Sequence, residues 1–225
     1  MLLRDLPPLL REEPGLASVL GRSSAVLAVP EPARALAIAG LADLSSRRPI
    51  VVAVPTTGDA ERLANDLRSF LGADAVDTFP AWETLPFERV SPSVETMGRR
   101  LRTMWRLQDP ERVPRVLVAP VRALVQRLGP HVEDVQPVVV PKGAHRDRDE
   151  LVRALVGAGY RREEVVEHRG ELAVRGSIID VFPSTADRPV RIDLWGDEVD
   201  RLTEFSVSDQ RSTTDLEHIE VFGCR

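Results

Sequence analysis

PVRIDLWGDEVDRLTEFSV (189–207) predicts a β-hairpin in the C-terminal part of the chain. Two runs in which apolar and polar residues alternate flank the pair Gly196-Asp197, a pattern typical of an antiparallel hairpin with a two-residue turn. The preceding stretch, VVEHRGELAVRGSIIDVFP (165–183), predicts another hairpin, with its turn near Gly170. We therefore expect an antiparallel sheet in this part of the chain.

Upstream of these hairpins, VQPVVV (135–140) indicates a strand and DRDELVRALVGAGY (147–160) indicates a helix that ends at Gly159. Two hairpins and one helix make a small α+β unit, distinct from a parallel sheet. We place this unit at residues 129–215.

Residues 1–128 follow another pattern, in which short apolar runs alternate with helical stretches. SAVLAV (24–29), PIVVAV (49–54) and RVLVAP (115–120) are continuous apolar runs, typical of strands that are buried on both faces of a parallel sheet. The expected helices cover residues 32–44, 59–72, 94–107 and 121–129. This part of the chain is therefore predicted to be an α/β domain.

The stretch ADAVDTFPAWETLPFERVSPS (73–93) interrupts this alternation with three prolines and widely spaced apolar residues. Such irregular spacing does not fit a helix, so we expect an ordered loop along the edge of the sheet. Trp82 and Phe87 are expected to fill the core rather than to form a ligand site.

A nucleotide site would follow the first predicted strand, where NTPases place a glycine-rich turn, a lysine and a serine or threonine. This chain reads PEPARA there. Pro30 and Pro32 lack the N–H groups that would hold phosphates, and Glu31 adds a negative charge. Arg34 and Ala35 stand at the places of the lysine and the hydroxyl. We expect no working ATP site, and an α/β domain that never bound nucleotide explains the same residues.

Other catalytic or metal-binding patterns are weak. The histidines, His131, His145, His168 and His218, lack metal-ligand spacing. The acidic residues of the last hairpin are best explained as solvated turn charges near arginines. Cys224, the single cysteine, has no evident paired base and excludes an internal disulfide. We expect no catalytic residue, no metal and no cofactor, and therefore no enzyme.

Composition restricts the location and the partners. The chain has no apolar run of membrane-spanning length and no secretion signal at its N-terminus, which favours the cytoplasm. A net charge of -5 argues against strong nonspecific binding of nucleic acid. Arg99, Arg102 and Arg106 share one face of the predicted helix 94–107, and a DNA backbone or another domain could contact that face.

RGSIIDVFPSTADRPVRIDLWGDEVDRLTEFSVSDQRS (175–212) resembles the small inserted domain that bacterial transcription-repair coupling factors (the Mfd family) share with the excision-repair protein UvrB. FPAWETLPFERVSPS (79–93) is more similar to the coupling factors, and the resemblance extends over about residues 20–222.

This resemblance implies that residues 1–128 are the first part of a degenerate motor-like (RecA/P-loop-like) domain with an incomplete sheet. It implies that residues 129–215 form the domain that docks UvrA and that residues 216–225 lead back into the first domain. The chain would then be a non-catalytic fragment of a longer repair protein. RNA-polymerase-binding and ATP- and Mg-dependent DNA-translocase modules would lie downstream, and a distal domain could cover the UvrA surface.

The family motif also implies candidate docking residues for UvrA. Arg161 follows the Gly-Tyr pair of the family, Arg175 and Gly176 are its Arg-Gly pair, and Ile179 and Phe182 lie nearby. Arginines among apolar residues often dominate the energetics of protein interfaces. The alternatives are that Phe182 belongs to the core and that the arginines pair with neighbouring acids, namely Glu163, Glu164 or Glu171.

Overall fold

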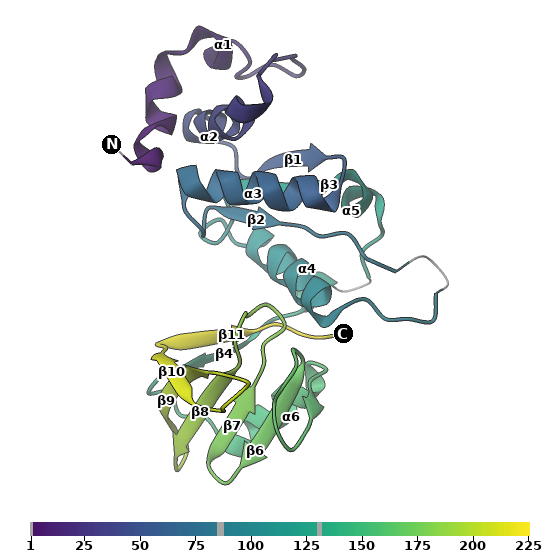
Figure 1. Cartoon of the computed structure of the whole chain (residues 1–225), viewed down its shortest axis with the longest axis vertical. Helices are drawn as coiled ribbons and strands as arrows, with labels where there is room; N and C mark the ends of the chain where they lie inside the picture. Colours follow the sequence, from purple (N-terminus) through teal and green to yellow (C-terminus); the bar gives the residue numbers. More distant parts are fainter. Residues whose placement is uncertain (1, 85–87, 130–131) are drawn as a thin grey trace. The chain divides into compact units, whose positions relative to one another are not determined.

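A computed structural model describes residues 2–84, 88–129 and 132–225 (Figure 1). The chain forms two compact units, of which the first comprises Met1–Trp82 and Arg106–Leu128 and the second comprises Glu83–Trp105 and Gly129–Arg225. The domain boundaries proposed from the sequence stay predictions. In the described ranges, no helix is both long enough and apolar enough to cross a membrane.

The first unit is built on a parallel sheet with the strand order β1-β3-β2. The strands are β1 (Ile50–Val54), β2 (Val76–Thr78) and β3 (Val116–Pro120). The helices are α2 (Arg34–Leu44), α3 (Thr57–Leu71) and the short α5 (Val121–Val125), and η1 (Leu3–Asp5), η2 (Pro7–Glu12), α1 (Pro14–Ala17) and η3 (Glu31–Ala33) are shorter turns. Buried side chains of α2 and α3 pack on Val116 and Val118 of β3.

Two of the three strands predicted for this unit are confirmed, since β1 and β3 lie within 49–54 and 115–120. The prediction of a strand at 24–29 is wrong, because these residues form no ladder and Val26 is 98% exposed. Their composition suits a strand, but a strand also needs a neighbour for its backbone N–H and C=O groups. The predicted loop 73–93 contains the edge strand β2. Trp82 is half-buried, and Phe87 lies outside the described residues.

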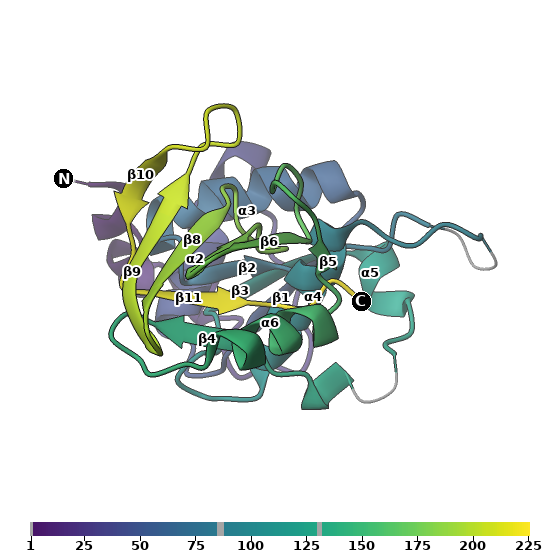
Figure 2. The ribbon, with the colours of Figure 1, turned by 90° about the horizontal axis from the view of Figure 1, so that it is seen from below.

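The second unit contains an antiparallel sheet with the order β10-β9-β8-β7-β6, to which β5 adds in parallel, and its strands can be followed in Figure 2. The strands are β5 (Arg161–Arg162), β6 (Glu171–Arg175), β7 (Ile178–Val181), β8 (Val190–Trp195), β9 (Glu198–Phe205) and β10 (Ser212–Asp215). The turn at Gly196-Asp197 is confirmed. The first hairpin turns at Gly176 and Ser177 instead of Gly170, because β6 begins directly after Gly170.

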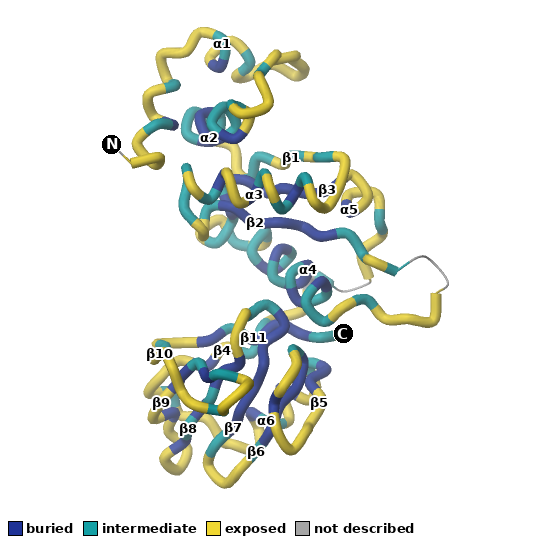
Figure 3. The backbone as a smooth tube through the Cα atoms, in the orientation of Figure 1, coloured by how far each residue is buried: buried dark blue, intermediate teal, exposed yellow. Residues whose placement is uncertain are grey.

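One face of this sheet is packed against the rest of the unit. The helix α6 (Arg148–Gly157) and a pair of antiparallel strands, β4 (Val138–Pro141) and β11 (His218–Val221), contribute to the core. Leu155 of α6 meets Leu172, Ile179 and Ile192 of the sheet in this core, and all four are fully buried. Figure 3 shows the middle of β7 as continuously buried. A short turn, η4 (Val132–Asp134), precedes β4.

The helix α4 (Val94–Leu107) contributes most of its length to the second unit. Gly98 allows α4 to pack closely against the segment that contains Ser184, because a Cβ atom at position 98 would lie 2.1 Å from Ser184 Oγ. Trp105 and Phe222 pack edge to face with their ring centroids 5.5 Å apart. On the helix, Arg99 pairs with Glu95 at 3.6 Å, and Arg106, within the first unit, pairs with Asp77 at 3.1 Å.

Candidate protein-docking site

The face of the six-stranded sheet opposite the main core carries charged side chains beside a smaller buried cluster of Val166, Ala173, Phe182 and Phe205. Side chains alternate along a strand, so the neighbours of the core residues point to this other face. The register places Ala173, Asp180, Arg191 and Thr203 in one row across β6 to β9. We call this surface the open face and define it by five residues. They are Arg175, Ile178, Asp180, Arg191 and Asp193.

Asp180 is the centre of the polar contacts on the open face. Its side chain is fully buried, and Arg191 donates from Nε to Asp180 Oδ1 at 2.7 Å and from Nη2 to Asp180 Oδ2 at 2.9 Å. Arg175 donates from Nη2 to the same Oδ2. The hydrogen bonds with Asp180 raise the pKa of Arg191. A buried carboxylate with two arginine partners is thus the organising contact of this face.

Arg175 stands at the end of β6 with 47% of its side chain exposed. Gly176 follows it in the hairpin turn with a φ of +60°, a conformation that glycine adopts without strain. A Cβ atom at Gly176 would meet nothing within 4 Å. The structure therefore brings the Arg-Gly pair predicted for docking to an open turn.

Arg161 is the other arginine of the predicted site and lies in β5, directly opposite Glu171 in the register. Its Nη2 lies 3.7 Å from Glu171 Oε1, so the predicted alternative pairing with Glu171 is confirmed, and its side chain remains 65% exposed. Glu171 is held by the backbone N–H groups of Glu167 and His168 at 2.9 and 2.8 Å. Burial of Glu171 opposes ionisation, but these hydrogen bonds and nearby His168 outweigh it and lower the pKa of Glu171.

The two apolar residues of the predicted site, Ile179 and Phe182, are buried. Ile179 is fully buried on the core face, because Ile178 and Asp180 take the outward positions of β7. Phe182 is 7% exposed, and the guanidinium of Arg169 lies 5.4 Å from its ring centroid. Neither side chain offers surface to a partner, and the alternative that Phe182 belongs to the core is confirmed.

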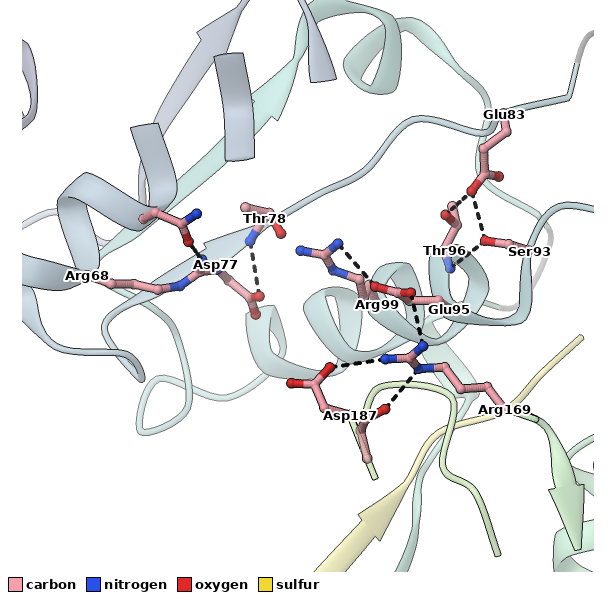
Figure 4. Close-up of polar contacts among 12 residues, drawn as sticks. Arg68, Asp77, Thr78, Glu83, Ser93, Glu95, Thr96, Arg99, Arg169 and Asp187 are labelled. Atoms are coloured by element: carbon pink, nitrogen blue, oxygen red, sulfur yellow. Dashed lines mark hydrogen bonds and ion pairs between the residues drawn. The ribbon is translucent and has the colours of Figure 1, made fainter. Parts of the chain in front are cut away.

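Arg169, another arginine near the predicted site, connects the neighbouring loop to α4 (Figure 4). It pairs with Asp187 at 3.0 Å and with Glu95 at 3.6 Å, and its Nε donates to Ala186 O at 2.8 Å. These contacts use the guanidinium inside the unit, so Arg169 has a structural role.

The N-terminus of α4 is fixed by a second polar cluster, also shown in Figure 4. Ser93 Oγ donates to Glu83 Oε1 at 2.8 Å, and the hydroxyl of Thr96 donates to the same oxygen. Burial works to raise the pKa of Glu83, but the hydrogen bonds from Thr96 and Ser93 outweigh it and lower this pKa. This cluster anchors α4 at its first turn.

Trp195 is a surface group that the sequence reasoning missed. It lies two residues after Asp193 on β8, hence on the same side as the open face, and it is 82% exposed. Tryptophan is highly buried on average, so a tryptophan this exposed at a hairpin end is a candidate contact for a partner. The alternation along β8, counted from the turn at Gly196, could have revealed this outward position.

The residues predicted at the degenerate nucleotide site lie at the start of α2. Pro30, Glu31, Pro32 and Arg34 are exposed, whereas Ala35 is buried, and Arg34 lies 3.9 Å from Glu31.

The first helix that follows a parallel strand in the structure is α3, after β1. Its first turn is occupied by its own residues, because Thr56 Oγ1 accepts from Asp59 N at 3.1 Å and donates to the Asp59 carboxylate at 2.7 Å. The carboxylate of Asp59 therefore stands where a phosphate would need positive potential. Within the parts of the chain that the structure covers, no group of three acidic, histidine or cysteine residues is arranged to hold a metal ion.

Comparison with known proteins identifies a matching domain family and several similar proteins. Residues 138–225 match the family described as the UvrB interaction domain. The chain is 40% identical over 206 residues to the transcription-repair-coupling factor of Mycobacterium tuberculosis, a match that covers 88% of this chain and 16% of that protein. It is 35% identical over 184 residues to that of Escherichia coli and 34% identical over 190 residues to that of Bacillus subtilis, covering 80% and 84% of this chain.

The resemblance to the N-terminal region of transcription-repair coupling factors is confirmed. The chain spans 16% of the length of the Mycobacterium and Escherichia coupling factors. The match to the UvrB interaction domain contains the whole hairpin region, from β6 to β10, and with it the open face.

Proposed function

We propose that this chain recruits the excision-repair protein UvrA to a repair complex and that it does so through the open face. The observation that carries the proposal is the joint exposure of Arg175 and Trp195 on one side of the sheet, within the match to the UvrB interaction domain. Arg161 extends the charged surface from the neighbouring strand β5.

The chemistry of this surface suits an acidic partner. Arginine and tryptophan are the residues most enriched among those that dominate interface energies. Arg175 is oriented by its hydrogen bond to the buried Asp180 carboxylate, and Arg161 lies 3.7 Å from the buried Glu171 carboxylate. An oriented guanidinium loses less side-chain entropy on binding, and its fork of N–H donors fits a carboxylate.

In this proposal the first unit is a scaffold, derived from a RecA/P-loop-like motor domain, that does not hydrolyse ATP. Support comes from PEPARA at the start of α2 and from Asp59 in the first turn of α3, which leave poor places for phosphate. Contacts with RNA polymerase and DNA, and the use of ATP and Mg, are assigned to parts of the parent protein beyond this chain.

Calorimetric titration of UvrA into the chain tests the proposal, with the variant Arg161→Ala, Arg175→Ala measured beside the wild type. The control is Arg62→Ala, Arg153→Ala, which removes the same charge from exposed positions of α3 and of α6. We expect the first variant to bind at least about tenfold more weakly, or about 1.4 kcal/mol, and the control to bind like the wild type. Absence of binding by the wild type would refute UvrA recruitment, and equal loss in both variants would refute the assigned surface.

A further inference from the structure

Asp180 is fully buried, yet it contacts the exposed Arg175, which belongs to the proposed docking surface. We propose that Asp180 is a positioning residue. It holds Arg175 in its docking orientation, and it can release Arg175 to a partner's carboxylate without being left unpaired. This inference rests on the proposed function, and it names a residue that a partner would never touch.

The hydrogen bonds of Asp180 are divided unequally between its two arginines. Arg191 reaches both carboxylate oxygens, at 2.7 Å for Oδ1 and 2.9 Å for Oδ2. Arg175 reaches only Oδ2, through a single nitrogen. Arg191 alone therefore satisfies both oxygens in a bidentate pair, and the bond from Arg175 is additional.

The two arginines also differ in exposure and in the number of their other contacts. The side chain of Arg191 is 16% exposed, its guanidinium lies 4.9 Å from the ring centroid of Phe205, and its Nη1 donates to Gln210 O at 3.2 Å. The side chain of Arg175 is 47% exposed at the end of its strand. Arg191 is thus fixed within the unit, whereas Arg175 stands between the buried carboxylate and the surface.

The charges make this arrangement suitable for capturing an anion. Two guanidinium groups face the Asp180 carboxylate, and the carboxylate of Asp193 lies near Arg191 and balances the second positive charge. The positive charge that is exposed is that of Arg175. A guanidinium has five N–H donors, and the bond to Asp180 uses one of the five. A carboxylate on the partner can take the others, and Asp180 then keeps its bidentate pair with Arg191. The buried carboxylate is never unpaired, which avoids the main cost of disturbing a buried ion pair.

The test is a double-mutant cycle on UvrA binding. It compares the wild type, Asp180→Asn, Arg175→Ala and the double variant, with Asp149→Asn as a control that removes an aspartate paired with Arg148 on α6. Asp180→Asn should weaken binding about tenfold in the wild-type background and less than about twofold in the Arg175→Ala background, because its effect passes through Arg175. Asp149→Asn should leave affinity unchanged. Equal weakening by Asp180→Asn in both backgrounds, or none in either, would overturn the inference.

A measurement on the chain alone separates this inference from the proposed function. Rotation of the Arg175 guanidinium about its Nε–Cζ bond should be slow in the wild type and fast in Asp180→Asn, as observed by NMR of the Nη groups. Fast rotation in the wild type would overturn the positioning role, whether or not UvrA binds and whether or not the variant folds. If rotation is slow but the wild type fails to bind UvrA, the proposed function fails and the positioning of Arg175 stands.

Discussion

Arg191 and Asp180 lie directly opposite each other on β8 and β7, and two hydrogen bonds of 2.7 and 2.9 Å join their side chains. This cross-strand pair occupies the middle of the face that is opposite the core. Its carboxylate also contacts Arg175, so the stability of the sheet and the orientation of an exposed arginine depend on one residue. The orientation of the exposed Arg175 therefore depends on a buried ion pair.

Replacing Arg191 should lower the free energy of unfolding more than replacing Arg175. Arg191→Ala leaves the buried Asp180 with one partner, so we expect the free energy of unfolding to fall by roughly 3–5 kcal/mol. Arg175→Ala leaves the bidentate pair intact and should cost no more than about 1 kcal/mol, as for other partly exposed ion pairs. Urea unfolding of both variants measures the difference, and similar losses would contradict the division of roles at Asp180.

Packing of α4 should depend on the absence of a side chain at Gly98. In Gly98→Ala the new Cβ would lie 2.1 Å from Ser184 Oγ, so the helix or the loop must shift, at a cost of about 1–3 kcal/mol. Gly58→Ala in α3 is the matched control, because the nearest atom to a Cβ there is Thr56 Oγ1 at 3.9 Å. The control should be stabilised by about 0.4–1 kcal/mol. Thermal unfolding of both variants measures these changes in stability. A Gly98→Ala protein as stable as the wild type would argue against the close contact.

The region around Arg161 should lose stability at acidic pH. The pKa of Glu171 is lowered from its ordinary value of 4.5, since backbone N–H groups and His168 favour the carboxylate despite its burial. The stabilisation is therefore fully present above pH 4.5 and is lost as the pH falls below 4.5 through the lowered pKa of the folded state. Glu171→Gln lacks this titration, so its deficit in unfolding free energy relative to the wild type should shrink below pH 4.5. A deficit that does not change with pH in urea unfolding would show that the charge of Glu171 is unimportant.

Trp195 should matter for binding and not for folding. Because its side chain is 82% exposed, we expect Trp195→Ser to change the free energy of unfolding by no more than about 0.5 kcal/mol. The same variant should bind UvrA at least about tenfold more weakly, because tryptophan is among the residues that most often dominate interface energies. Trp105→Ala is the contrasting variant, since Trp105 is 8% exposed against Phe222 and should cost about 3–5 kcal/mol. Unchanged affinity of Trp195→Ser would remove Trp195 from the docking surface.

The sequence predicts the elements that are determined locally. The turn at Gly196-Asp197 follows from the alternating runs beside it, β1 and β3 follow from continuous apolar runs, and α4 follows from its helical pattern. The first hairpin was misplaced because the chain contains two Arg-Gly pairs six residues apart, at 169–170 and at 175–176. Both glycines have positive φ, +87° and +60°, so glycine conformation alone does not identify the turn.

The contacts of the docking residues depend more on strand pairing than the turn and the helices do. Arg161 and Arg175 could be placed by resemblance, but their partners Glu171 and Asp180 follow from the register of neighbouring strands, which no local pattern provides. The prediction of Ile179 at the surface rests on its proximity in sequence to the Arg-Gly pair and is wrong, because Ile179 is fully buried. A strand sends adjacent residues to opposite faces, so Ile178 and Ile179 cannot both face a partner.

Site-specific photocrosslinking to UvrA tests whether UvrA docks on the open face. A benzophenone amino acid replaces Trp195 in one protein and Val125 in another, since Val125 is 75% exposed on α5 of the first unit. We expect a covalent adduct with UvrA from position 195 and none from position 125. Adducts from position 125 alone, or from neither position although the complex forms, would contradict docking through the open face.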